Sequence, residues 1–441
     1  MKRSRLESWF REVVIGAILE HSKPIVFMLA FVWRRLLPRT TIIAITGSLG
    51  KTTAKECLAD VLSAEGRTFR SYRNQNAPIA VALNILRIRP SHRYAVIEVA
   101  GSAPRMMQKS ARLLKPNVAI VLNVLHTHTT AFTDLAEHAA EKAALLGALK
   151  PGTLAVVNDD DPFVSRMPAP AGCRILRFGT GEAAEYRLSD ITGAWPGRLD
   201  FTMQTPEGPR RIETQLVGQH WLTSAAAVMT AAIALGIPAG RAQEAFNRSA
   251  PFDARLQPMQ LPCGAIVLRD DYNASIDTIE ASLRVLADAT ALRRLLVITD
   301  MSDFGRNRKQ RLKYLAARGA QVADGIVFIG ESADYGMRRA VEAGISPAEA
   351  HAFPSLQPAA EFLRGELRAG DLVLLKGRTT DHTARAFFAQ FASVKCWKDH
   401  CTKRMLCDTC WELGVPRSEM NRAKRVNRTE HVGPRESTKG G

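Results

Sequence analysis

Residues 41–62 place a strand, a glycine-rich loop and a helix in immediate succession, and this segment constrains the fold most strongly. The β-branched run at 41–46 predicts a buried parallel strand, and apolar residues recur at helical spacing after Lys51. Such a loop lets backbone N–H groups approach a phosphate, and the helix adds the positive end of its dipole. Lys51 can neutralise phosphate charge and Thr52 can bind magnesium. The predicted nucleotide-binding residues of the loop are Gly47, Ser48, Gly50, Lys51, Thr52 and Thr53.

The loop departs from the general phosphate-loop pattern at one position. That pattern asks for a glycine five residues before Gly50, where this chain has Ile45, so the glycine pair is Gly47 and Gly50. The alternative interpretation is a glycine turn that binds no phosphate. Nucleotide binding does not define the reaction, because kinases, GTPases, ATPases and ATP-dependent ligases share this kind of loop.

The chain has 441 residues and a net charge of +17, with 60 Lys and Arg against 43 Asp and Glu. The length suggests about three domains. Residues 1–40 and 393–441 carry +5 each, so the basicity is concentrated at the two ends. No nucleic-acid partner is expected, because aromatic and basic residues are not interleaved along any patch. An aromatic content of 7% and a charged fraction of 23%, which is near the globular norm, exclude a wholly disordered chain.

Polar residues follow several predicted strands in the first half of the chain. Glu98 ends the strand at 94–98, where open α/β sheets bind ligands, and its carboxylate could hold magnesium. Asn123 follows the next strand and leads into His128, and Lys142 lies on the helix after that. Taken singly, a polar residue at such a position is more often an ordinary loop or surface group. The other polar positions of this set are Asn74, Asn76, Asn158 and Asp160.

The second half carries an independent set of motifs. Its alternating strands and helices predict a second α/β domain of about 140 residues. The motifs are Arg255, the run from Asp270 through Tyr272 and Asn273, the pair Asp300-Met301, and Lys376-Gly377.

In this order, the motifs resemble those of the Mur ligases, ATP-dependent enzymes that join amino acids or peptides to cell-wall precursors. The likeness is greatest to the MurF-type ligases, which add D-alanyl-D-alanine, and it runs from Thr41 to about Phe391. It implies an α/β fold, with a P-loop-type central ATPase domain on a mostly parallel sheet and a smaller Rossmann-like α/β C-terminal domain. We therefore divide the chain into an N-terminal arm (1–40), a central domain (41–253), a C-terminal domain (254–392) and a Cys-rich basic tail (393–441).

The resemblance implies the reaction as well. ATP phosphorylates a carboxylate of the acceptor, and an incoming amine attacks the acyl phosphate to give an amide, ADP and phosphate. Lys51 holds phosphate by this likeness, Thr52 and Glu98 bind one Mg²⁺, and His128 and Lys142 help to place a second. The lysine that matches Lys142 is carbamylated in many members of the family. The alternative for this position is a solvated helix lysine.

Further roles follow from the resemblance, residue by residue. The nucleotide is expected to contact Asn158, Asp160, Arg255 and Asp270. The substrate side is expected to involve Asn74, Asn76, Tyr272, Asn273 and Lys376. Lys376 matches the family's Lys-Gly-Ser loop, which contacts the incoming amine, although this chain reads Lys-Gly-Arg.

The chain differs from the family pattern at three places. Only 40 residues precede the phosphate strand, so the domain that binds the UDP-linked substrate is expected to be missing. In a segment resembling Gly-x-His-Asn-x-x-Asn, Trp221 and Ser224 replace the two asparagines, which puts the adenine contact of the motif in doubt. Ala80 stands where a glycine is expected.

Three functions remain open at this point. The first is a MurF-like amide ligase, in cell-envelope or related biosynthesis, with a carboxylate acceptor other than the standard UDP-linked peptide. The second is a cell-wall ligase completed by a partner subunit. The third is a nucleotide-binding scaffold without turnover. An odd count of seven cysteines and the lack of a secretory signal favour the cytoplasm.

The N-terminal arm contains an apolar stretch that Glu20, His21, Lys23 and Pro24 interrupt. Each of the two resulting pieces is too short to cross a bilayer core of ~30 Å. The arm is expected to be either a helix that packs on the body or a basic anchor on an anionic membrane surface.

The tail gathers four of the seven cysteines within fifteen residues, at Cys396, Cys401, Cys407 and Cys410, with His400 beside the second. Four thiolates could close a structural zinc site. Reduced cysteines without a ligand, or redox chemistry, are the alternatives, and the tail could recruit a protein partner. Residues 417–441 are polar and basic and are expected to be disordered.

Overall fold

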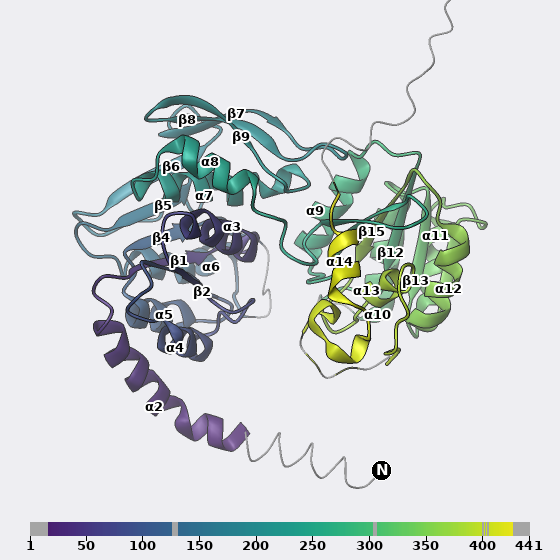
Figure 1. Cartoon of the computed structure of the whole chain (residues 1–441), viewed down its shortest axis with the longest axis horizontal. Helices are drawn as coiled ribbons and strands as arrows, with labels where there is room; N and C mark the ends of the chain where they lie inside the picture. Colours follow the sequence, from purple (N-terminus) through teal and green to yellow (C-terminus); the bar gives the residue numbers. More distant parts are fainter. Residues whose placement is uncertain are drawn as a thin grey trace, which may run out of the picture. The chain divides into compact units, whose positions relative to one another are not determined.

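The computed structural model describes residues 16–125, 131–302, 307–398, 401, 403 and 405–426. The chain forms two compact units (Figure 1). The first comprises residues 1–189, 203–210 and 223–246, and the second comprises residues 190–202, 211–222 and 247–441. Each unit contains a β-sheet with helices packed against it.

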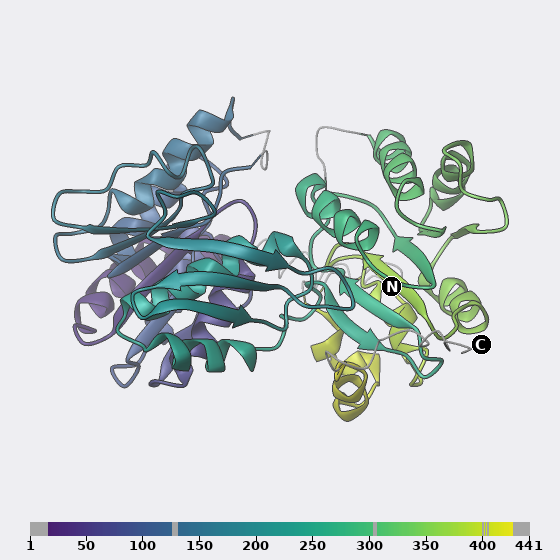
Figure 2. The same ribbon diagram turned by 90° about the horizontal axis from the view of Figure 1, so that it is seen from above.

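The first sheet has nine strands in the order β2-β3-β1-β4-β5-β6-β7-β8-β9. Neighbouring strands from β2 to β7 pair in parallel. The last three strands lie side by side at one edge, in teal in Figure 2, and each of them contains one boundary between the two units, at 189/190, 202/203 and 210/211. The bounds are β1 Thr41–Thr46, β2 Thr68–Arg70, β3 Tyr94–Glu98, β4 Val118–Val121, β5 Leu154–Asn158, β6 Arg174–Gly179, β7 Tyr186–Thr192, β8 Asp200–Thr205 and β9 Gly208–Glu213.

Alternating side chains of this sheet form a core with helices α4, α5 and α6. Ile42 and Ala44 of β1, for example, lie in one buried cluster with Val81 of α4 and Leu145 of α6. Successive strand residues point to opposite faces of a sheet, so Ile43 and the other alternate residues point to the opposite face. The helices are α3 Lys51–Ser63, α4 Pro78–Arg87, α5 Met106–Leu114, α6 Leu135–Leu146, α7 Leu222–Ala234 and α8 Ala239–Asn247.

The second sheet has six strands in the order β10-β11-β15-β12-β13-β14. All neighbouring strands pair in parallel except β10 and β11, which are antiparallel. Its strands are β10 Gln257–Gln260, β11 Ile266–Asp270, β12 Arg293–Ile298, β13 Gly325–Ile329, β14 Ala350–Phe353 and β15 Asp371–Lys376. Its helices are α9 Ile276–Ala287, α10 Arg308–Ala320, α11 Ala333–Glu342, α12 Leu356–Glu366, α13 Ala384–Phe388 and α14 Arg417–Ala423.

Apolar residues fill both faces of this second sheet. Leu296 and Leu374 belong to one buried cluster, whereas their neighbours Val297 and Leu375 belong to the other. Strands buried on both faces are typical of parallel α/β sheets. The predicted α/β class, with a mostly parallel first sheet and a smaller second sheet, is confirmed.

The N-terminal arm forms one helix, α2 (Gly16–Arg35), which continues through Pro24. Proline removes one backbone donor from this helix, and the surrounding turns retain theirs. Trp33 Nε1 donates to the carbonyl of Ile88 at 2.8 Å, and Ala30 is fully buried in the first core. The predicted packing of the arm on the body is thus confirmed.

The tail is structured further than its polar composition predicts. Helix α14 occupies part of the region expected to be disordered, and Met420 and Ala423 of this helix are buried in a core cluster of the second unit. Cys407 and Leu413 belong to the same cluster. The expectation of disorder was wrong for this helix, because a few apolar residues fill one face of the C-terminal sheet. Residues 427–441 lie outside the described residues.

Candidate functional site

The phosphate loop connects β1 to α3, and glycine is required at two of its positions. Gly50 has φ of +87°, and a Cβ there would lie 2.3 Å from Ser224 Oγ. A Cβ on Gly47 would lie 2.8 Å from Leu122 Cβ. Ser224 also donates to the carbonyl of Gly50 at 3.2 Å. The loop therefore packs too tightly against its neighbours for any larger residue at these two positions.

Asn123, which follows β4, holds the phosphate loop in place through hydrogen bonds. Its Oδ1 accepts hydrogen bonds from the backbone N–H groups of Ser48 and Leu49, both at 2.8 Å. Lys51 Nζ donates to the carbonyls of Gly47 at 2.6 Å and Ser48 at 3.1 Å, which holds its ammonium over the loop. Helix α3 starts without a side-chain cap, so the N–H groups of its first turn remain for an anion.

Thr52 and Glu98 meet beside the loop. Thr52 Oγ1 donates to Glu98 Oε2 at 2.9 Å, and Asn76 Nδ2 donates to Glu98 Oε1 at 2.7 Å. Ser71 Oγ accepts from the backbone N–H of Glu98 at 3.1 Å, which fixes the end of β3. The Glu98 carboxylate is 1% exposed. A hydroxyl and a carboxylate placed together beside a phosphate loop are the oxygen donors that Mg²⁺ takes alongside phosphate oxygens.

Lys142 is buried on α6, in contact with a histidine. Lys142 Nζ lies 2.7 Å from His138 Nε2, one helical turn away. Burial, together with the charge of Lys51, lowers the pKa of Lys142 to about 7 against the opposing effect of Glu141 and Asp161. The lysine is therefore not the solvated surface residue that was the alternative at this position. His138 escaped the sequence analysis, although its spacing of four from Lys142 on a predicted helix was a usable signal.

The side chains of Asn158 and Asp160 form hydrogen bonds with neighbouring backbone groups. Asn158 Nδ2 donates to the carbonyl of Leu122 at 3.0 Å. Asp160 Oδ1 accepts from the backbone N–H and the hydroxyl of Thr180 at 2.8 and 3.0 Å. Asn74 is exposed in the segment before α4, and His128 lies outside the described residues.

In the second unit, Asp270 and Lys376 end adjacent strands and are register partners. They form an ion pair, and Ser282 Oγ donates to the same carboxylate oxygen at 2.5 Å. Lys376 is 1% exposed, and burial lowers its pKa against the opposing charge of Asp270. The ammonium of Lys376 is thus paired with Asp270 inside the C-terminal unit.

Tyr272 packs beside this pair. The Arg255 guanidinium lies over the Tyr272 ring, 4.6 Å from its centroid, and Thr379 donates to the Tyr272 carbonyl at 2.8 Å. The loop between β11 and α9, which also carries Asn273, is thereby tied to the loop after β15.

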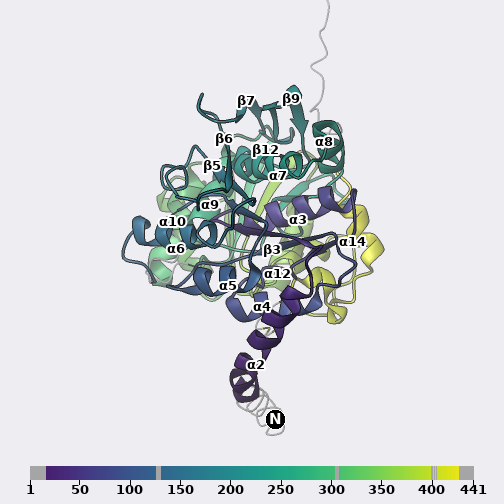
Figure 3. The same cartoon turned by 90° about the vertical axis from the view of Figure 1, so that its left-hand side faces the viewer.

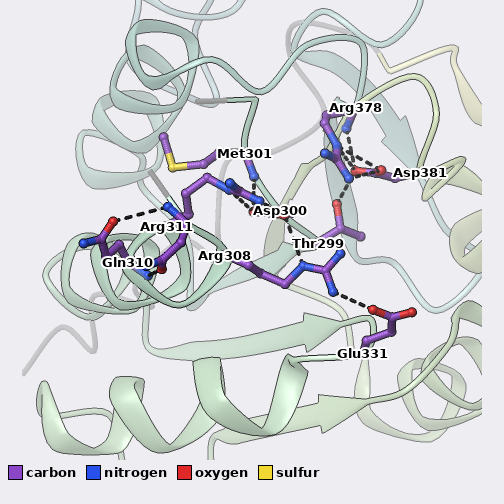
Figure 4. A network of polar contacts seen from close by, with 10 residues as sticks. Thr299, Asp300, Met301, Arg308, Gln310, Arg311, Glu331, Arg378 and Asp381 are labelled. Atoms are coloured by element: carbon purple, nitrogen blue, oxygen red, sulfur yellow. Dashed lines mark hydrogen bonds and ion pairs between the residues drawn. The ribbon is translucent and has the colours of Figure 1, made fainter. Parts of the chain in front are cut away.

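A cavity of about 570 Å³ lies at the carboxyl ends of β12, β13, β14 and β15. This is the edge at which parallel α/β sheets bind ligands. Figure 4 shows its polar wall. Asp300 accepts two hydrogen bonds from Arg311 at 2.9 and 2.7 Å, and Arg308 pairs with Glu331 at 2.6 Å.

A second ion pair completes this wall. Arg378 NH2 lies 2.8 Å from Asp381 Oδ1, and Thr299 Oγ1 donates to Asp381 Oδ2 at 2.6 Å. None of these residues was assigned a role from the sequence. The signal was the basic run at 306–311, which follows a strand that ends in Thr299 and Asp300.

The segment with the two replaced asparagines is buried at its centre. His220 and Trp221 are tilted against each other with centroids 4.4 Å apart, and burial lowers the pKa of His220 to about 4. Within the part of the chain that the structure describes, His220 Nδ1 and Trp221 Nε1 have no hydrogen-bond partner. Trp221 thus fills core volume where the family motif has an asparagine.

The four tail cysteines line one small cavity together with His382, but the predicted zinc site is not supported. Among the described residues, no three His, Cys, Asp or Glu side chains are placed to hold a metal ion. Cys407 Sγ lies 3.3 Å from His382 Nδ1, and basic side chains approach the other sulfurs: Arg385 lies 3.8 Å from Cys396 Sγ and Lys403 lies 3.9 Å from Cys410 Sγ. None of the seven cysteines, all of which the structure describes, forms a disulfide, and His400 lies outside the described residues.

Two domain models of one family match the chain in succession. The Mur ligase middle domain matches residues 45–232, and the Mur ligase glutamate ligase domain matches residues 254–379. The first match covers the phosphate loop, Glu98 and Lys142, and the second covers the cavity wall as far as Arg378.

Curated relatives carry the name UDP-N-acetylmuramoyl-tripeptide–D-alanyl-D-alanine ligase. The proteins from Buchnera aphidicola and Escherichia coli are each 29% identical to this chain, over 276 and 275 residues. These alignments cover 62% of this chain and 60% of each relative. The chain thus matches about three fifths of the length of these relatives.

Solved structures share the fold. MurF from Acinetobacter baumannii superposes with a TM-score of 0.76 at 24% identity, over 83% of this chain and 80% of that one. MurF from Thermotoga maritima in complex with ADP gives 0.68 at 23% identity, over 81% and 80%. From the two consecutive domain models and the shared fold, we conclude that the chain belongs to the Mur ligase family.

Proposed function

We propose that this protein is an ATP-dependent ligase that joins an amine to a carboxylate. The observation that carries the proposal is the group formed by the phosphate loop, the Thr52–Glu98 pair and the buried Lys142 in one unit. Its relatives bear the name of a ligase that acts on a peptide precursor and D-alanyl-D-alanine, and a solved relative binds ADP.

The proposed chemistry has two steps. A carboxylate oxygen of the acceptor attacks the γ-phosphorus of ATP, and ADP leaves. The amine nitrogen then attacks the acyl carbon, phosphate leaves and the nitrogen loses a proton, which leaves an amide. The first step brings two anions together, and in the second step phosphate leaves as an anion, so Lys51 and the N-terminus of α3 would lower both barriers by neutralising charge.

Thr52 and Glu98 are the residues that would hold Mg²⁺, because their oxygens already lie 2.9 Å apart beside the loop. The ion would neutralise the charge of the β- and γ-phosphates. Asn76 orients the Glu98 carboxylate through its second oxygen. His128 stays a predicted ligand for a second ion.

Lys142 has the protonation state that carbamylation requires. Only a neutral amine adds to CO₂, and a pKa of about 7 leaves roughly half of the side chain neutral at pH 7. The product is an anion, which would convert a cation that repels Lys51 into a group that can organise a metal. We propose this modification for Lys142.

The cavity in the second unit is the proposed binding place of the amine component. Its wall carries both charges, with Arg308 and Arg378 set against Glu331 and Asp381. A small zwitterion, such as an amino acid or dipeptide, offers both an ammonium and a carboxylate to such a wall. We retain the domain bounds 41–253 and 254–392 for the two catalytic domains, which the family matches at 45–232 and 254–379 support.

An ADP-release screen over carboxylates and amines tests the ligase proposal. Wild-type protein should release ADP only with a matching acid and amine, and Lys51→Ala should not. The exposed lysine of α5 supplies a matched control, because Lys109→Ala removes the same charge away from the loop. Equal ADP release by wild type and Lys51→Ala under every condition would show that the chain is not a ligase, and binding of ATP without turnover would identify a scaffold.

A further inference from the structure

Large apolar side chains are exposed along one face of α2 and its C-terminal end. Ile25, Met28, Leu29 and Val32 repeat at helical spacing and are each 49–58% exposed. Phe31 and Leu36 extend this face. Elsewhere in the described part of the chain, exposed large apolar side chains occur singly, at Tyr72, Leu83, Leu292 and Trp411. A clustered apolar surface of this kind marks an interaction site, whereas isolated exposed residues do not.

The opposite face of α2 is already occupied by the first unit. Ala30 and Leu37 are buried in its core, and Trp33 bonds to the backbone after α4. Arg34 donates to the carbonyls of Leu114 at 2.6 Å and Lys115 at 3.0 Å, at the end of α5. Figures 1 and 3 show α2 extending away from the sheet of this unit. The helix is therefore held in place with its apolar face outward.

Basic side chains border this face. The Arg35 guanidinium lies over the Phe31 ring, 3.4 Å from its centroid, and Lys115 Nζ lies 5.7 Å from the same ring. The pKa of Lys115 is lowered, first by the charge of Arg35 and then by slight desolvation and by Lys150 and Arg34. Arg35, Lys150 and Arg34 thus each repel the charge of Lys115. No ion pair is found for Arg35, Lys115 or Lys150 among the described residues.

We propose that the outward face of α2 lies in the interface of a membrane that contains anionic phospholipid. Apolar side chains would enter the boundary between headgroups and acyl chains, while the cations at its border would contact lipid phosphates. The positive charges beside the apolar face of α2 have no ion-pair partner in the described part of the chain, and this favours an anionic membrane over a neutral protein surface as the binding partner. The helix would lie along the membrane surface. Among the described residues, no helix is both long enough and apolar enough to cross a membrane.

Vesicle cosedimentation of the full-length protein tests this inference. Binding should be strong to phosphatidylglycerol-rich vesicles, weak to pure phosphatidylcholine vesicles and reduced by salt. The double change Leu29→Glu with Val32→Glu should weaken binding at least about tenfold, because it places two anions in the apolar face. Arg35→Gln with Lys115→Gln should remove most of the preference for anionic lipid.

The matched control is Leu292→Glu, which changes a leucine that is 75% exposed in the second unit. This variant should bind vesicles like wild type. Circular dichroism of each variant confirms folding, which these exposed positions should not disturb. ADP release with soluble substrates should be the same for all of them, so a failure of the ligase proposal would be seen separately. The inference is overturned if the protein binds both vesicle types equally or if the Leu29→Glu with Val32→Glu variant binds vesicles like wild type. It is also overturned if the only effect of these two changes is to dissociate a dimer of the protein.

Discussion

Asp408 of the tail forms a buried two-point ion pair with Arg269 of β11, at 2.7 and 3.1 Å. Asp271 is the second carboxylate beside this fully buried guanidinium, and Lys424 Nζ lies 2.7 Å from Asp408. The pair joins the tail to the centre of the C-terminal unit.

Asp408→Asn should lower the free energy of unfolding of this unit by about 3 kcal/mol, because it removes one of two anions that compensate a buried guanidinium. Urea unfolding measures the change. Glu412→Gln is the control in the same tail, since Glu412 pairs with Lys398 and Lys403 at the surface, where ion pairs contribute little. Equal losses in the two variants would contradict the role of the buried pair.

The same carboxylate should make the unit acid-sensitive. Burial alone would raise the pKa of Asp408, but the charge and hydrogen bonds of Arg269, with Lys424, outweigh it and hold the pKa well below its usual range. The stabilisation is complete above the unfolded pKa of about 3.9 and is lost as the pH falls towards the lower folded value. The difference in unfolding free energy between wild type and Asp408→Asn should therefore shrink on acidification below about pH 4.

Gly50→Ala should weaken nucleotide binding as well as stability. The new Cβ would meet Ser224 Oγ at 2.3 Å in a left-handed backbone. Gly152→Ala is the matched control, because φ there is +81° and no atom lies within 4 Å of the added Cβ. The control should lose only about 1–2 kcal/mol of stability and should bind ATP normally by calorimetry. Similar nucleotide affinities in both variants would argue against a tightly packed phosphate loop.

Glu98→Gln should abolish the dependence of nucleotide affinity on Mg²⁺. The amide keeps the side-chain shape but loses the charge that would hold the ion, so ADP release should fall by at least about a hundredfold. ATP binding measured in EDTA should be unchanged. Glu65→Gln, which alters a carboxylate paired with Arg241 on the same unit, should behave like wild type. A Mg²⁺ response in Glu98→Gln equal to that of wild type would exclude Glu98 as a metal ligand.

Lys142 should acquire a carbamate in bicarbonate, seen by ¹³C NMR of protein equilibrated with labelled bicarbonate. The signal should grow as the pH rises through about 7, since burial lowers the pKa of Lys142 to that value and only the neutral amine reacts. Lys142→Arg should show no such signal, whereas Lys109→Arg should retain it. A signal of equal size in both variants would place the modification elsewhere.

The elements around the phosphate loop were predictable because their signals are local. A β-branched run, two glycines and Lys51 occupy consecutive positions, and Glu98 ends a strand that the hydrophobic run already defines. The rule that open α/β sheets bind ligands at the carboxyl ends of their strands placed Glu98 near the site, and the family resemblance implied its pairing with Thr52.

Other features depend on contacts between distant residues, which no local pattern contains. The helix at 417–423 has little hydrophobic period, and it forms because Met420 packs in the core and Lys424 meets Asp253 and Asp408. The ion pair between Arg308 and Glu331 likewise joins two loops that follow different strands. The depressed pKa of Lys142 arises from burial, which its helix position alone did not reveal.

The attachment of the tail through Asp408 also bears on the order of folding during synthesis. The first unit has all of its residues once Phe246 has been made, so it can fold while the rest of the chain is still being translated. The second unit lacks Asp408 and Lys424 until its final segment emerges, and until then the Arg269 side chain and the core around Met420 stay incomplete. A nascent chain stalled before residue 408 should therefore present one protease-resistant unit and one that chaperones still recognise.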